Sequence, residues 1–263
     1  MSDRPFAVVT GASSGIGYEL AKQFAEHGFD LLVTDIDSKI DEAAPAFEFF
    51  GAKVQTVQAD LAEYEGVEKL IQAIKATGQP LEAIAINAGF GEGGKFTQTD
   101  LQKELKMIDL NISSSVHLAK FATQVMEQRR KGRILFTSSI AALMPGPFEA
   151  VYAATKTFLR SFSQALREEM KDFGVTVTAL MPGPTDTNFF HAAEMDDTRA
   201  ASSKKDDPAQ VAKQGFEALM SGKDEVVAGS FMNKVQAAVI QAMPEPIKAA
   251  AHRQLSEPGS GSN

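Results

Sequence analysis

The chain of 263 residues contains no cysteine, and its four histidines are scattered without the spacing of metal ligands. Without cysteine, disulfide scaffolds, thiolate metal sites and cysteine nucleophiles are excluded. No apolar run reaches the ~18 residues that cross a bilayer, and a strand expected from Pro5-Phe6 onward leaves no room for a signal peptide. We therefore expect a cytoplasmic protein with no metal site and no membrane partner.

Positive charge is also scarce, because 26 lysines and arginines stand against 34 acidic residues, for a net charge of −8. Such a surface repels nucleic acid unless a local basic patch intervenes. The one basic cluster, Arg129-Arg130-Lys131, comes just before Gly132, where a helix is expected to end. Cations there complement the helix dipole, so we expect no nucleic-acid partner.

What the sequence does contain is a regular alternation of short apolar runs and longer helical patterns. The candidate strands are Phe6–Thr10, Asp30–Thr34, Lys53–Gln58, Ala83–Asn87, Arg133–Ser138, Val175–Met181 and Glu225–Ala228. Helices are expected near residues 15–27, 38–50, 63–77, 100–130, 149–172 and 208–221, with further helical patterning over Phe231–Leu255. Strands that are apolar at consecutive positions are typical of a sheet covered on both faces. The pattern predicts an α/β fold, a doubly wound parallel seven-stranded sheet with helices on both faces.

No linker divides the chain, so residues 1–255 are expected to form a single domain. The most irregular segment, residues 188–207, combines Phe189-Phe190 with polar residues. Two interpretations remain open, a surface excursion and a lid over a substrate. Residues 256–263 have the composition of a linker and are expected to be disordered.

The first expected strand runs into the turn Thr10-Gly11-Ala12-Ser13-Ser14-Gly15-Ile16-Gly17, which opens a helix. Gly11 permits the tight turn, Gly15 lets the backbone approach a phosphate, and Gly17 lets the helix lie close to the strand. The exposed N–H groups and the helix dipole then form an anion site suited to a pyrophosphate. This turn therefore predicts a dinucleotide-binding Rossmann fold.

The spacing TGxxxGxG resembles that of the short-chain dehydrogenase/reductase family, and the resemblance continues to about residue 190. Asp35, 18 residues beyond Gly17, can accept hydrogen bonds from ribose hydroxyls and repel a 2′-phosphate. No arginine or lysine stands at Ser13, Ser14 or Ile36, where relatives that use NADP often carry one. NAD(H) is therefore favoured over NADP(H), although Asp35 can merely end a strand and Lys39 can reach a phosphate.

Further motifs match the family in order and spacing. Asp60-Leu61 matches its adenine-contacting position, although a helix cap is an equally good interpretation of Asp60. Asn87-Ala88-Gly89 matches the second half of its NNAG signature, with Ile86 in place of the first Asn. Met181–Thr187 resembles its PGxxxT segment, whose threonines contact the nicotinamide carboxamide and a phosphate, or it is a plain Pro/Gly turn. The cofactor-binding residues that the resemblance implies are Gly11, Ser13, Ser14, Gly15, Ile16, Gly17, Asp35, Asp60, Leu61, Asn87, Ala88, Gly89, Tyr152, Lys156, Pro182, Gly183, Thr185 and Thr187.

The most specific signal is Tyr152 with Lys156 four residues later, preceded by Ser139 at the end of the fifth expected strand. Residues four apart share one face of a helix, so the phenol and the ammonium are expected side by side. The ammonium should lower the pKa of the phenol toward neutrality, where a general acid/base works best. Ser138 adjoins Ser139, but the 13-residue spacing to Tyr152 favours Ser139.

The family resemblance assigns roles to these side chains. Tyr152 exchanges the proton with the substrate oxygen, Ser139 stabilises charge on that oxygen, and Lys156 assists Tyr152 and holds the nicotinamide ribose. Asn111 matches the fourth catalytic position, where it anchors a water that passes protons from Lys156. A YxxxK pattern alone is common by chance, but the joint spacing with Ser139 is not.

We therefore expect an oxidoreductase that transfers a hydride between NAD(H) and a secondary alcohol or ketone. The rival hypothesis is a catalytically silent nucleotide sensor or scaffold of the same fold. Seven apolar residues favour a largely apolar substrate: Phe90, Leu143, Met144, Pro147, Phe148, Phe189 and Phe190. A homodimer through the helices near 100–130 and 149–172, or a homotetramer, is expected.

Overall fold

The consecutive apolar runs form one parallel sheet in the computed structural model, which describes residues 4–262. Its strands are β1 (Phe6–Thr10), β2 (Asp30–Asp35), β3 (Val54–Gln58), β4 (Leu81–Ile86), β5 (Gly132–Thr137), β6 (Val175–Pro182) and β7 (Glu225–Ala228). Their order across the sheet is β3-β2-β1-β4-β5-β6-β7, with every neighbouring pair parallel. This confirms the predicted seven-stranded, doubly wound sheet, and each strand lies within two residues of its predicted bounds.

Alternate residues of each strand point to opposite faces, and each face has its own layer of helices. Ala7 and Val9 of β1 pack in the core that contains α1 (Gly15–Glu26), α2 (Ile40–Glu48) and α9 (Pro208–Met220). Phe6 and Val8 pack in the core that contains α3 (Tyr64–Ala76), α5 (Ser114–Arg129) and α6 (Ala150–Met170). Burial on both faces explains why the strands lack an alternating polar pattern.

The single helix expected over residues 100–130 is interrupted, which corrects the sequence-based expectation. Helix α4 (Leu101–Ile108) ends in a π-helical turn over Asp109–Ser113, and α5 then continues to Arg129. A π turn inserts one extra residue, and such turns are frequent at functional sites. The amphipathic pattern of the sequence does not reveal one inserted residue. The turn contains Asn111, whose side chain it directs inward, where it is fully buried.

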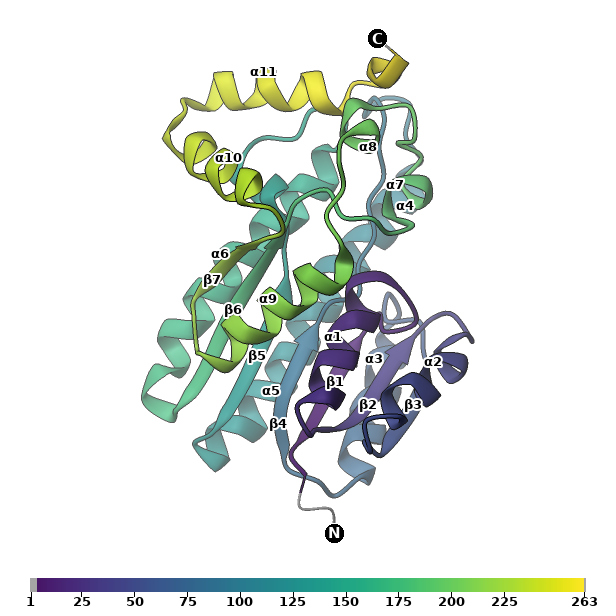
Figure 1. The fold of residues 1–263 in the computed structure, drawn as a ribbon, viewed down its shortest axis with the longest axis vertical. Helices are drawn as coiled ribbons and strands as arrows, with labels where there is room; N and C mark the ends of the chain where they lie inside the picture. The colour runs from purple at the N-terminus through teal and green to yellow at the C-terminus, as the bar shows by residue number, and fades with distance from the viewer. Residues whose placement is uncertain (1–3, 263) are drawn as a thin grey trace.

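Two helices follow the last strand and lie across the top of the molecule, above the carboxyl ends of the strands (Figure 1). They are α10 (Phe231–Ala242) and α11 (Glu245–Ser256). The short helix α8 (Arg199–Ser202) packs against α11, and α7 (Phe189–Ala192) lies below α8, near α4 (Figure 1). Within residues 4–262, no helix combines the length and the apolar character needed to cross a membrane. The carboxyl edge of the sheet is therefore covered by segments from the second half of the chain.

The C-terminal segment differs from the disordered tail expected over 256–263. Ser256 ends α11, and residues 260–262 form a 3-10 turn. Gly259 and Gly261 donate N–H bonds to the carboxylate and the carbonyl of Asp197, at 2.7 and 2.8 Å. The linker-like composition does not reveal these long-range acceptors, and residue 263 lies outside the described residues.

Candidate functional site

A cavity of about 1220 Å³ opens at the carboxyl edge of the sheet, where open α/β sheets bind ligands. Every residue predicted to bind the cofactor lines this cavity, from the glycine-rich turn to Thr187. Ser139 lines it as well. Asn111 does not, and its position is described below. The structure therefore brings all the predicted site residues except Asn111 to the lining of one cavity.

The glycine-rich turn has the geometry that its spacing predicts. Gly11 and Gly15 have φ angles of +69° and +57°, which L side chains rarely adopt. A Cβ atom on Gly17 would lie 1.9 Å from the carbonyl oxygen of Gly11, so only glycine fits there. Ser14, the N-cap of α1, makes no side-chain hydrogen bond to the first turn. The turn therefore fits a dinucleotide pyrophosphate, because first-turn N–H groups that no cap side chain occupies can bind an anion.

Asp35 ends β2 at the cavity and is fixed by hydrogen bonds. Its Oδ2 accepts from the Ser13 N–H at 3.1 Å and from the Ser13 hydroxyl at 2.8 Å. Its Oδ1 accepts from the Asp37 N–H at 3.1 Å. Asp37 also lines the cavity, although the sequence analysis did not single it out, whereas Lys39 does not line it. Two carboxylates therefore stand at this end of the site.

The Asp60 side chain pairs with a lysine and does not cap a helix. Its Oδ2 lies 2.8 Å from the Lys106 ammonium, and its Oδ1 accepts from the Ala62 N–H. The N-cap of α3 is Glu63, so the helix-cap interpretation of Asp60 was wrong. Burial acts to raise the pKa of Asp60, but the hydrogen bonds from Lys106 and Ala62 outweigh burial and lower the pKa. Its neighbour Leu61 is buried in the core and also lines the cavity.

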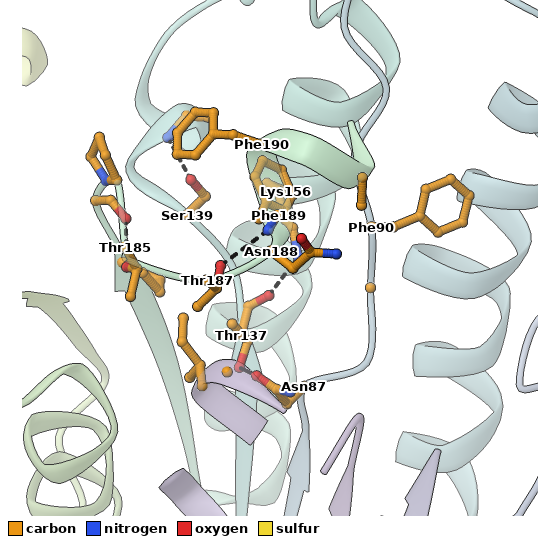
Figure 2. Close-up of a pocket in the computed structure, with 18 of the residues that line it drawn as sticks. Asn87, Phe90, Thr137, Ser139, Lys156, Thr185, Thr187, Asn188, Phe189 and Phe190 are labelled. Atoms are coloured by element: carbon orange, nitrogen blue, oxygen red, sulfur yellow. Dashed lines mark hydrogen bonds between the residues drawn. The ribbon is translucent and has the colours of Figure 1, made fainter. Parts of the chain in front are cut away.

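Asn87 joins three strands under the floor of the cavity (Figure 2). Its side-chain amide donates to the Thr10 carbonyl at 3.0 Å, and its Oδ1 accepts from the Thr137 hydroxyl at 2.9 Å. The Thr10 hydroxyl in turn accepts from the N–H groups of Asn87 and Ala88. These bonds fix the ends of β1, β4 and β5 relative to one another. The departure at Ile86 from the NNAG signature leaves this network intact.

Ser139, Tyr152 and Lys156 lie on one side of the cavity, the first after β5 and the other two on α6. The Lys156 ammonium donates to the Thr137 carbonyl at 2.9 Å (Figure 2). It also lies 5.6 Å from the centre of the Tyr152 ring. The Ser138 hydroxyl donates its proton to the Lys156 backbone carbonyl at 2.8 Å, so this proton is not free to bond to a substrate. Of the two serines, Ser139 is the one whose side chain hydrogen-bonds with Tyr152 and lowers its pKa.

The ionisation of Tyr152 differs from the sequence-based expectation. Burial raises the pKa of Tyr152 well above its usual value, the Glu149 carboxylate raises it further, and the Ser139 hydroxyl lowers it only in part. Burial also lowers the pKa of Lys156 to about 8. The lowering expected near neutrality concerned Lys156 together with the positive ring of the oxidised cofactor, so it stays a prediction for the cofactor-bound enzyme. The Lys156 ammonium faces the Tyr152 ring and the Thr137 carbonyl. The sequence alone does not show how deeply Tyr152 and Lys156 are buried.

Asn111 lies behind the cavity wall, within reach of Lys156. Its side-chain amide donates to the Phe90 carbonyl and to the Thr155 hydroxyl, both at 3.0 Å, and its Oδ1 accepts from the Phe90 N–H at 3.2 Å. A Cβ atom on Gly89 would lie 2.8 Å from Asn111 Oδ1 and 3.4 Å from Lys156 Nζ. A side chain at position 89 would therefore collide with Asn111 and touch Lys156, so glycine lets both approach the backbone there.

The Pro/Gly segment after β6 lies beside the glycine-rich turn at the cavity. A Cβ atom on Gly15 would lie 3.1 Å from the Thr187 methyl group, so Thr187 faces the turn. The Thr185 hydroxyl donates to the Gly183 carbonyl at 2.9 Å. A Cβ atom on Gly183 would lie 2.2 Å from Asn233 of α10. The segment thus connects the cofactor half of the cavity to the C-terminal helices.

Several apolar side chains line the cavity on the side of Tyr152. Of the seven apolar residues predicted there, Phe90, Met144, Phe189 and Phe190 line it, whereas Leu143, Pro147 and Phe148 do not. The Phe189 ring lies 5.2 Å from the Tyr152 ring, and the Lys205 ammonium lies 5.0 Å from the Phe190 ring.

Several polar lining residues were missed by the sequence analysis, among them Glu149, Lys204, Lys205, His252 and Ser256. Glu149 stands three residues before Tyr152, a spacing that would place it near the phenol. Nothing in the sequence connects residues 252 and 256 with the site, because that contact spans more than a hundred residues.

The doubly wound sheet, the glycine-rich turn and the side chains around it define a nucleotide-binding oxidoreductase. The family model of the short-chain dehydrogenases matches residues 5–198. The chain belongs to the short-chain dehydrogenase family, as its motifs predict. An uncharacterized oxidoreductase of Bacillus subtilis is 31% identical over 188 residues, which are 70% of this chain and 76% of that protein.

Solved structures show the same fold. A short-chain dehydrogenase from Sphingobium yanoikuyae in complex with NADPH has a TM-score of 0.80 at 23% identity, covering 92% of this chain and 97% of that one. A short-chain dehydrogenase/reductase from Burkholderia phymatum in complex with NAD has a TM-score of 0.79 at 22% identity, covering 91% and 92%. The two neighbours thus carry different nicotinamide cofactors.

Proposed function

We propose that the protein transfers a hydride between NAD(H) and a secondary alcohol or ketone, with Tyr152 as the general acid/base. The observation that carries the proposal is the position of Ser139, Tyr152 and Lys156 on the wall of the cavity that the glycine-rich turn opens into. The cofactor, when bound, supplies or accepts the hydride, and its oxidised ring adds a positive charge that favours the phenolate.

Each side chain then has a definite task. In reduction, the Tyr152 hydroxyl gives its proton to the carbonyl oxygen, and in oxidation the phenolate takes that proton back. The Ser139 hydroxyl donates a hydrogen bond to the same oxygen as negative charge develops on it. Lys156 holds the cofactor ribose and stabilises the phenolate. Asn111 orients a water that exchanges protons with Lys156, which its position beside Gly89 supports.

The preference for NAD(H) rests on the carboxylates of Asp35 and Asp37 at the adenosine end of the cavity. A carboxylate accepts hydrogen bonds from ribose hydroxyls and repels a 2′-phosphate. The only cation that the sequence offered as a phosphate partner at this end, Lys39, does not line the cavity. A Lys106 ammonium is nearby, but it is paired with Asp60.

The experiment that tests the function is hydride transfer to a panel of ketones, measured by the loss of reduced-cofactor absorbance with NADH and with NADPH. Turnover of at least one ketone, faster with NADH, is expected. The alternative function, a sensor of the same fold, predicts that both cofactors bind and no ketone is reduced. An apolar ketone should react faster than a charged one of equal size, because phenylalanines and a methionine line the substrate end.

Residues 188–207 are proposed to close over the substrate as a lid. Phe190, Ala193 and Met195 form a small buried cluster of their own, so this segment can move as a unit. Several bonds tie it to the rest of the chain, among them Gly93 N–H to the Ala193 carbonyl at 2.9 Å, the ion pair of Lys103 with Glu194, and the bonds of Gly259 and Gly261 to Asp197. Amide hydrogen exchange in 188–207 is expected to slow when cofactor and substrate are both bound. Equal exchange in the free and ternary states would leave an ordinary surface loop.

A homodimer through the α4 and α6 faces is proposed as the assembly. Leu101 and Leu105 on α4 and Phe158 on α6 are exposed apolar side chains, with exposed fractions of 60%, 44% and 37%. Apolar side chains of this size are typical of buried interface positions. Sedimentation velocity on wild type and on Leu105→Glu measures the assembly, and a monomeric wild type would contradict it.

A further inference from the structure

Three buried polar side chains meet beside Tyr152, and no step of the proposed mechanism uses them. Glu149 precedes α6, while His252 and Ser256 lie on α11, 103 and 107 residues further along the chain. Their exposed fractions are 7%, 5% and 2%, and all three line the cavity. We call Glu149, His252 and Ser256 the C-terminal latch.

The carboxylate of Glu149 is the centre of the latch. Its Oε2 lies 2.8 Å from His252 Nε2 and accepts from the Ser256 hydroxyl at 2.6 Å. Nδ1 of His252 is buried and has no partner among residues 4–262. Nε2 is therefore the ring nitrogen that faces the carboxylate, and Glu149 Oε2 is bracketed by His252 and Ser256.

The other charged groups around the latch do not neutralise that carboxylate by direct contact. On α6, the Lys156 ammonium is hydrogen-bonded to the Thr137 carbonyl. On α11, the Arg253 guanidinium lies 5.7 Å from the centre of the Phe148 ring, and Lys248 pairs with Glu245. On α8, which packs against α11, Arg199 bonds to Ser260. Glu149 is the N-cap of α6 and stands three residues before Tyr152, a spacing that puts both side chains on one face, and both line the cavity. A carboxylate there makes ionisation of the Tyr152 hydroxyl less favourable and raises its pKa.

We propose that Glu149 is a positioning residue that holds α11 against the active site through His252 and Ser256 and sets the pH range in which Tyr152 gives its proton to a carbonyl. The proposal rests on the proposed role of Tyr152. In reduction, a hydride from the reduced nicotinamide bonds to the carbonyl carbon and the carbonyl π bond breaks. The oxygen takes the proton of Tyr152, which leaves an alcohol, the oxidised cofactor and a phenolate that solvent reprotonates. A carboxylate beside the phenol thus extends the pH range of reduction toward alkaline pH.

The test is the pH dependence of ketone reduction and of alcohol oxidation in Glu149→Gln. Glutamine keeps an oxygen that accepts from His252 and Ser256 but removes the charge. The alkaline fall of reduction and the rise of oxidation are both expected to move about one pH unit toward acid. The matched control is His27→Gln at the exposed end of α1, where no shift is expected. Unchanged profiles in Glu149→Gln would overturn the proposal.

Ser256→Ala distinguishes the effect of the Glu149 charge on Tyr152 from the role of Glu149 in holding α11 in place. It keeps the carboxylate, so neither pH profile should move toward acid, but amide exchange in residues 245–256 should speed up at least threefold. Unchanged exchange, or an acid shift equal to that of Glu149→Gln, would contradict the proposal. If Glu149→Gln does not fold, this exchange measurement still decides whether the latch holds α11.

A third measurement does not depend on enzymatic activity. The chain has three tyrosines and no tryptophan, so tyrosinate absorbance is not obscured. The difference between the titrations of wild type and Tyr152→Phe reports Tyr152 alone. In a Glu149→Gln background this difference is expected to appear at lower pH. An active Tyr152→Phe enzyme would contradict the proposed role of Tyr152 as general acid/base. The titration would still show whether Glu149 affects the ionisation of Tyr152.

Discussion

Tyr152→Phe is expected to lower turnover by about 10²–10⁴-fold, the effect of losing a general acid/base. The substitution removes one oxygen from a buried side chain whose ring packs 5.2 Å from that of Phe189. The packing of the ring is retained, so the melting temperature and the dissociation constant of NADH should stay close to those of wild type. Single-turnover reduction of an active ketone, followed by cofactor absorbance, measures the loss.

The matched control for this variant is Tyr64→Phe. Tyr64 is 67% exposed at the start of α3 and stacks on His117, away from the cavity lining. Its loss of a hydroxyl should leave turnover unchanged. A Tyr152→Phe enzyme that kept more than about a tenth of the wild-type rate would show that another group transfers the proton.

Asp35→Ser is expected to weaken NAD(H) binding by about 10–100-fold, because hydrogen bonds from ribose hydroxyls to a carboxylate are worth ~1.5–3 kcal/mol. NADP(H) should bind no worse, since one of the two carboxylates that would face its 2′-phosphate is gone. Isothermal titration of both cofactors against wild type and variant measures the two effects separately. A wild-type enzyme that prefers NADPH would contradict the assignment.

Asp35 also holds the glycine-rich turn through the hydroxyl and the N–H of Ser13, so its replacement can act through the turn. Ser13→Ala removes the hydroxyl partner and keeps the charge. It should weaken both cofactors to a similar, smaller extent and leave their ratio unchanged. If Ser13→Ala altered the ratio as much as Asp35→Ser, the geometry of the turn would set the preference instead of the charge.

The sheet and the cofactor half of the site could be predicted because their signals are local. Each strand is a short apolar run, and the glycine-rich turn, Asp35 and Asn87 all follow strands whose carboxyl ends meet at one edge. The YxxxK spacing likewise reports a single helical face. Such features need only a few consecutive residues to be recognised.

The sequence could not predict features that depend on burial or on contacts between residues far apart in the chain. Lys156 stands four residues from Tyr152, but the effect of burial on both groups and the effect of Glu149 on the phenol depend on the packed structure. The π turn at Asp109–Ser113 is one inserted residue within a helical pattern. Asp60 was assigned two possible roles, and only the position of Glu63 at the N-cap of α3 excludes one of them.

The C-terminal latch also has a consequence for the order of events during protein synthesis. All seven strands and the glycine-rich turn are complete once residue 228 has been made. Glu149 gains its partners only when residues 252 and 256 have left the ribosome. A nascent chain can therefore assemble its nucleotide-binding sheet before its active site is covered, and the carboxylate beside Tyr152 is enclosed only after residues 252 and 256 have emerged.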